Sequence, residues 1–160
     1  MKYIGFFLVL LSVLKFSDSY SKHVKKRLRE CEGFLEFITH VRLQMSCYLK
    51  PIRALSEGFH SEALSKTGFL QYIGECENIL EAYKKAERQL SLSLEESEIL
   101  ERLFSSLGAG YLDDELKLLD TYKASLYEIY EKTKKEAPKS AKLVSTLSVT
   151  AAIGFLILVI

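Results

Sequence analysis

Tryptophan is absent from this 160-residue sequence, and proline occurs only twice. Aliphatic residues, lysine, glutamate and serine dominate instead, a composition typical of helices and unlike that of a β-barrel or a β-sandwich. There is also no excess of charge of one sign, because 22 basic residues face 21 acidic ones. Proteins that bind nucleic acid through its phosphates are rich in positive charge, so this balance argues against a nucleic-acid partner.

Cysteine is scarce, with three residues at unequal spacing: Cys31, Cys47 and Cys76. An odd number at these distances fits neither a closed disulfide framework nor a zinc site. Cys31 and Cys76 fall on apolar helical stripes, where a free cysteine behaves as a small hydrophobic residue. We therefore expect reduced thiols that pack in a core.

The sequence motifs of several enzyme classes are missing. There is no phosphate-binding GxxxxGK[ST] loop, no GxGxxG after a strand, no GxSxG elbow and no HExxH, and the three histidines are isolated. Asp113, Asp114 and Glu115 form the densest acidic group, and their charges suit the amino end of a helix better than a metal or acid/base site. We expect a protein that is not an enzyme and holds no cofactor or metal.

Both ends of the sequence are apolar. The run from Leu143 to Ile160 carries no charge and, as a helix, would be about 27 Å long, close to the hydrocarbon thickness of a bilayer. The run from Tyr3 to Leu14 is shorter and is followed by Lys15, so it fits either a retained anchor that extends to about Tyr20 or a cleaved signal peptide.

Positive charge lies on the domain side of both apolar runs. Residues 22–29 and 134–142 contribute Lys22, Lys25, Lys26, Arg27, Arg29, Lys134, Lys135, Lys139 and Lys142. The positive-inside rule places that side in the cytoplasm, and this favours the retained anchor. The expected organisation is an N-terminal transmembrane anchor (1–20), a cytoplasmic helical domain (21–142) and a C-terminal transmembrane anchor (143–160).

The apolar residues between the anchors recur at steps of three and four, which predicts amphipathic helices. The expected helices cover residues 24–49, a short piece at 52–55, a short run between Gly58 and Gly68, a long helix over 69–90, one from 94 to the glycine turn at 108–110, and one from 113 that ends before Pro138. Ser93 and Glu96 have the spacing of a capping box at the start of the fifth. The fold class is all-α: an antiparallel bundle of about four to six helices flanked by two transmembrane helices.

Several parts of the sequence resemble the stage III sporulation protein AB family. The likeness is concentrated in residues 92–107, in the turn Leu107-Gly108-x-Gly110, and in Lys139-x-x-Lys142-Leu143 with the terminal anchor. A looser match runs from Arg27 to Pro51. Two positions depart from the family's pattern, because Tyr111 replaces a commonly acidic residue and Glu115 replaces a common glutamine.

The resemblance implies a non-enzymatic platform in the mother-cell membrane, part of the apparatus between mother cell and forespore and similar to the F-type platform proteins of type II secretion. Its expected partners are a separate secretion-type ATPase, other channel subunits and the lipid bilayer, and self-association is left open. The candidate partner-binding residues are Glu95, Glu96, Glu98, Gly108, Gly110 and Glu115. Two alternatives remain: the acidic residues form only a solvated face, or the chain is an exported, tail-anchored interaction protein whose mature end is Tyr20 or Ser21.

Overall fold

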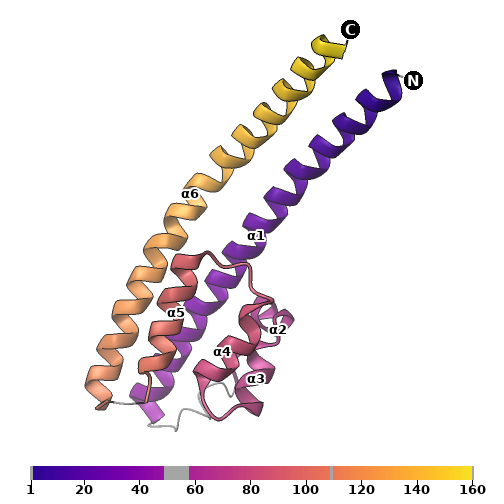
Figure 1. The fold of residues 1–160 in the computed structure, drawn as a ribbon. Helices are drawn as coiled ribbons and strands as arrows, with labels where there is room; N and C mark the ends of the chain where they lie inside the picture. The colour runs from indigo at the N-terminus through magenta and orange to yellow at the C-terminus, as the bar shows by residue number, and fades with distance from the viewer. Residues whose placement is uncertain (1, 49–57, 109, 160) are drawn as a thin grey trace. The chain divides into compact units, whose positions relative to one another are not determined.

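The computed structural model describes residues 2–48, 58–108 and 110–159. Within these residues the chain forms six α-helices and no strand, which confirms the all-α fold class (Figure 1). The helices are α1 (Lys2–Tyr48), α2 (Glu62–Lys66), α3 (Phe69–Glu75), α4 (Ile79–Glu87), α5 (Leu94–Ser106) and α6 (Leu112–Val159). The short piece expected at residues 52–55 lies outside the described residues.

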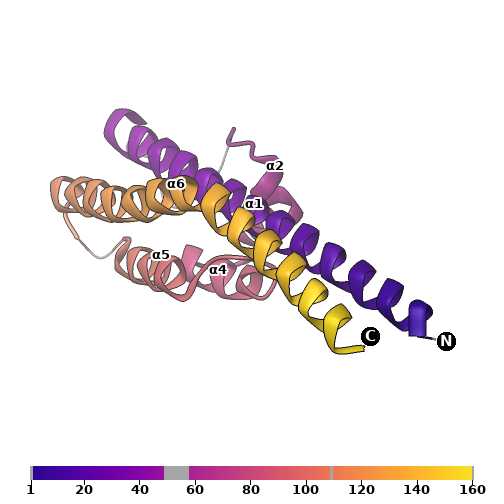
Figure 2. The same cartoon turned by 90° about the horizontal axis from the view of Figure 1, so that it is seen from above.

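The chain divides into two compact units. The bundle unit comprises Lys26–Glu131, and the terminal unit joins the residues up to Lys25 with those from Lys132 onward. In the terminal unit the two ends of the chain lie at the same end, as both Figure 1 and Figure 2 show. Among the described residues, no helix combines the length and the apolar character that crossing a bilayer requires. The side chains of Tyr3–Leu14 and most of those after Leu143 lie outside the described part.

Five aromatic rings form the centre of the bundle unit. Phe34 and Phe37 of α1 contact Phe69 of α3 and Phe104 of α5, with ring centroids 5.1–6.4 Å apart. Tyr83 of α4 packs on Phe34 and Phe104. Most of these pairs meet edge to face, the arrangement that the charge distribution of aromatic rings favours. One cluster therefore joins α1 to three other helices.

Helices α1 and α6 run in opposite directions through the bundle unit (Figure 1), as expected for an antiparallel bundle. Arg42 of α1 and Asp120 of α6 form a two-point ion pair, with Nε 2.6 Å from Oδ1 and Nη2 3.0 Å from Oδ2. The planar guanidinium matches a carboxylate in this geometry, and the hydrogen bond to Asp120, together with its charge, raises the pKa of Arg42. Leu119 and Leu126 of α6 are buried in the core of the bundle unit.

The helix predicted over residues 69–90 is wrong, because the structure breaks it into α3 and α4. Asn78 adopts an extended conformation between them, and its side chain accepts a hydrogen bond from the amide of Glu81 at 2.8 Å. This is the geometry of a helix N-cap, which favours a new helix start over continuation. The break turns α4 so that Ile79, Ala82 and Tyr83 are buried.

The predicted helix end before Pro138 is also wrong, because α6 continues through this residue to Val159. Proline in a helix interior removes one backbone hydrogen bond and costs about 3 kcal/mol. Strong helix formers such as Glu136, Ala137 and Ala141 flank Pro138, and they favour continuation of the helix on both sides of it. The first bundle helix likewise begins earlier than the predicted Val24, since α1 is continuous from Lys2.

Candidate interaction site

The connection between α4 and α5 is held against α1 by charged side chains. The amide of Ser91 donates to Oε2 of Glu30 at 2.6 Å, and Nζ of Lys26 donates to the carbonyl oxygen of Gln89 at 3.1 Å. Lys26 also lies 3.5 Å from the carboxylate of Glu30, which is only 1% exposed as a residue. Side chains of α1 therefore provide hydrogen-bond partners for the Ser91 amide and the Gln89 carbonyl, which hold the loop against α1.

The start of α5 is fixed to α1 through Glu96. Its Oε2 accepts from the amide and the hydroxyl of Ser93, at 2.7 and 2.9 Å, and from Nε of Arg27 at 2.8 Å. The first two contacts complete the capping box predicted from the sequence, with the Glu96 amide donating to the Ser93 hydroxyl at 3.3 Å. The third is an ion pair with a fully buried carboxylate. One side chain thus caps α5 and joins it to α1.

Cys31 lies next to this carboxylate on α1. Burial raises the pKa of its thiol to about 12, and the negative charge of Glu96 adds to the effect. A buried thiol with a raised pKa carries little thiolate and is a poor nucleophile. Cys31 and Cys76 are both free and buried, which confirms that they pack in the core. The side chain of Cys47 lies outside the described part.

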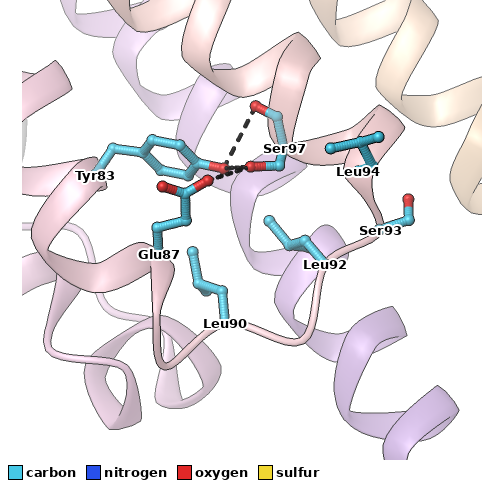
Figure 3. A pocket seen from close by; sticks show the side chains of 7 residues that line it. All are labelled: Tyr83, Glu87, Leu90, Leu92, Ser93, Leu94 and Ser97. Atoms are coloured by element: carbon cyan, nitrogen blue, oxygen red, sulfur yellow. Dashed lines mark hydrogen bonds between the residues drawn. The ribbon is translucent and has the colours of Figure 1, made fainter.

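A pocket of about 260 Å³ opens beside the same loop (Figure 3). Its floor is polar: the hydroxyl of Tyr83 lies 2.8 Å from Oγ of Ser97, which donates to Glu87 at 2.7 Å. The ring of Tyr83 is fully buried, and burial raises the pKa of its hydroxyl to about 12. The phenol therefore stays a neutral hydrogen-bond donor, and the Glu87 carboxylate provides the acidic edge of the pocket.

Three leucines make up the apolar part of the lining. Leu90, Leu92 and Leu94 line the pocket (Figure 3), and Leu94, the first residue of α5, is 78% exposed. Glu95 and Glu98 are exposed on the same first turns of α5. The result is a hollow lined by leucines and one carboxylate, on a loop that two contacts hold against α1. Such a surface suits an apolar side chain flanked by positive charge.

The six candidate residues fall into two groups at opposite ends of α5. At the amino end, Glu95 and Glu98 are exposed, whereas Glu96 is buried and does not belong to an exposed acidic face. At the carboxyl end, Oε1 of Glu115 accepts from the amides of Gly108 and Gly110, at 2.8 and 3.1 Å. Glu115 is itself 7% exposed, so this second group builds the turn between α5 and α6.

The turn also explains why two types of residue suit position 115. Both bonds reach a single oxygen, and a glutamine would offer the same carbonyl oxygen to the two amides. Gly108 has a φ of 89°, a left-handed conformation that glycine adopts without strain. Asp113 and Asp114 are exposed in the first turn of α6, where their charge suits the helix dipole.

The model of the stage III sporulation protein AB family matches residues 2–160. The chain belongs to this family. Membership covers the whole described chain, including both apolar ends and the pocket. No curated protein matches the sequence significantly, and no solved structure matches the fold significantly.

In this member of the family, sequence patterns alone missed four residues that build the site. Glu30 reaches the α4–α5 loop, and Arg27 reaches the start of α5, only after α1 packs beside them, and their charge excludes them from an apolar stripe. Tyr83 lies within the helix predicted over residues 69–90, but its hydroxyl contact with Ser97 depends on how α4 meets α5. The exposure of Leu94 could have been predicted from the local sequence. This leucine directly follows the N-cap Ser93, so it comes before the residues that form the buried face of α5.

Proposed function

We propose that this chain is a non-enzymatic membrane platform of the channel apparatus formed between mother cell and forespore during sporulation. Its apolar ends act as anchors in the mother-cell membrane, and the bundle unit lies in the mother-cell cytoplasm. There it docks a separate secretion-type ATPase and other channel subunits. Membership of a stage III sporulation family supports the process, while the role within it is our inference.

The observation that carries the proposal is a separation of charge between the two units. The terminal unit contains nine basic and two acidic residues, a net charge of +7, and it includes both apolar ends. The bundle unit contains 13 basic and 19 acidic residues, a net charge of −6. Positive charge beside apolar segments is typical of the cytoplasmic side of a membrane anchor. An acidic domain next to it is suited to a basic protein partner.

The pocket at the α4–α5 loop is the docking surface that we assign to this partner. Its occupant is an apolar side chain with lysine or arginine beside it, because leucines line the pocket together with Glu87. Glu95 and Glu98 add exposed negative charge on the first turns of α5. The loop is held by Glu30 and Lys26 before any partner arrives, which lowers the entropic cost of binding.

A binding experiment tests the docking surface. The full chain, reconstituted in nanodiscs, is titrated with the secretion-type ATPase of the same apparatus, and nucleotide hydrolysis is followed in parallel. Leu94→Ser combined with Glu98→Lys should weaken binding at least tenfold. Leu43→Ser, which changes another exposed leucine at 55% exposure, should leave it unchanged. Equal affinity for all three chains would contradict this surface, and hydrolysis by the chain alone would contradict a non-enzymatic role.

A labelling experiment tests the topology. Glu77 is exposed in the bundle unit between α3 and α4, so a cysteine there is accessible in the folded chain. In intact mother cells, an impermeant thiol reagent should label Glu77→Cys only after the membrane is opened. Labelling before that step, together with a mature amino end at Tyr20 or Ser21, would support the exported alternative and exclude docking to a cytoplasmic ATPase.

A further inference from the structure

Four lysines of α6 lie on one face of the helix. Lys132, Lys135, Lys139 and Lys142 are separated by three, four and three residues, and all four are exposed. At about 100° per residue these positions fall within an arc of about 80°. They therefore form a continuous row, which we call the lysine row. All of it belongs to the terminal unit.

The lysine row ends where the charge-free apolar run begins, since Lys142 directly precedes Leu143. Along the helix, Lys139 and Lys142 lie within about 6 Å of that boundary, whereas Lys132 is about 16 Å away. Charges in water influence each other over about 8 Å at physiological salt. Only the two lysines nearest the boundary are therefore close enough to interact strongly with charges at the edge of the apolar run.

The charges around the row are mostly positive. Glu136 is the only acidic residue from Lys132 to Ile160, against five lysines. Lysine carries a compact charge on a long flexible stem, so its ammonium group can reach along the helix while its methylenes cover apolar surface. A ligand at this position must be anionic and must lie beside hydrocarbon.

We propose that Lys139 and Lys142 form a binding site for the headgroups of anionic phospholipids, with the rest of the row adding weaker attraction. The proposal rests on the membrane insertion of the C-terminal segment described under Proposed function. A phospholipid next to the apolar run satisfies both conditions. Its headgroup phosphate is anionic, and its acyl chains provide hydrocarbon beside the run that follows Lys142. Each lysine at the surface of an anionic membrane strengthens binding by about fivefold.

The test compares two double variants that remove the same charge. The full chain is reconstituted in nanodiscs with equal amounts of phosphatidylglycerol and phosphatidylcholine, and native mass spectrometry counts the lipids that stay bound. K139Q/K142Q should lower the preference for phosphatidylglycerol more than tenfold. K132Q/K135Q should lower it less than threefold, and raising the salt should reduce the preference of the wild-type chain.

The outcomes separate this inference from the proposed function. If the wild-type chain leaves the membrane in alkaline carbonate, the insertion and therefore the proposed function are wrong. If the chain stays inserted but binds both lipids equally, or if the two double variants behave alike, the lipid site is overturned while the platform remains. If K139Q/K142Q keeps its lipid preference but loses a channel subunit, the row binds an acidic protein and the lipid site is likewise overturned.

Discussion

Nε of Arg27 lies 2.8 Å from Oε2 of Glu96, although 69 residues separate the two in the sequence. The carboxylate is fully buried and also caps α5, so this single contact connects the start of α5 to α1. Burial raises the pKa of Cys31, the Glu96 charge adds to the effect and the Arg27 charge opposes it, so both members of the pair act on this buried thiol.

Glu96→Ala should destabilise the chain by about 3 kcal/mol or more, because it leaves the Arg27 charge without this partner and removes an N-cap contact. Glu95→Ala changes an exposed neighbour of the same charge and should shift stability by less than about 0.5 kcal/mol. Urea unfolding of the full chain, followed by circular dichroism, gives both values. Similar losses in the two variants would show that Glu96 acts only as surface charge.

Phe34→Ala should cost about 3–5 kcal/mol, because the ring is fully buried and contacts Phe69, Tyr83 and Phe104. Near-ultraviolet circular dichroism should lose intensity at the same time, since the chain has no tryptophan and the signal comes from tyrosine and phenylalanine. Tyr127→Ala is the control at 52% exposure. An unchanged unfolding midpoint in Phe34→Ala would refute the aromatic centre.

Gly108→Ala should destabilise the turn between α5 and α6 by about 1–2 kcal/mol, because alanine is strained at a φ of 89°. Gly110→Ala should cost less, since a Cβ there would meet Cγ of Glu115 at an ordinary 3.7 Å. Hydrogen exchange of the amides in the turn, measured alongside unfolding, localises the effect. Equal costs at the two glycines would contradict the described turn.

Cys31 should make stability fall at alkaline pH. Its pKa rises from about 9 in the unfolded chain to about 12 in the folded one, so below pH 9 both states are protonated and the thiol adds no pH dependence. Above pH 9 only the unfolded state releases the proton, which lowers the unfolding free energy by up to about 1.4 kcal/mol per pH unit.

The measurement for Cys31 is urea unfolding between pH 8 and 10.5, in the wild-type chain and in Cys31→Ala. The variant should show a flatter decline above pH 9, whatever its stability at neutral pH. Tyr83 also has a pKa raised to about 12, but its contribution is present in both chains and cancels. Parallel curves would mean that Cys31 titrates normally in the folded state.

Capping residues a few positions apart in the sequence predict where a helix begins. Ser93 and Glu96 are three residues apart, and the capping box formed as expected. Asn78 and Glu81 have the same spacing and also indicate a helix start. The continuous apolar pattern around them predicts one uninterrupted helix instead. Apolar periodicity alone cannot distinguish one long helix from two short ones that bury the same residues.

Contacts between distant segments could not be predicted. An apolar stripe through Cys31, Leu35 and Ile38 leaves out Phe34 and Phe37, because a stripe assumes that only one face of the helix is covered. Helix α1 contacts the core on a wider arc, and even Glu30 is buried there. Glu30 bonds the amide of Ser91, 61 residues away, and Glu96 pairs with Arg27, 69 residues away, so only the folded arrangement identifies these contacts.

The core of the bundle unit takes side chains from both α1 and α6, as Phe34 and Leu126 illustrate. A ribosome releases α1 long before Leu126 exists, so the part of the core that α6 completes stays open until the last third of the chain is made. The apolar segment before Lys15 emerges earlier still, and it must reach its final surroundings while the bundle is open. Chains that stop before α6 lack Leu119, Leu126 and Tyr130 and leave the core incomplete, which makes truncated products targets for chaperones and proteases rather than partly active proteins.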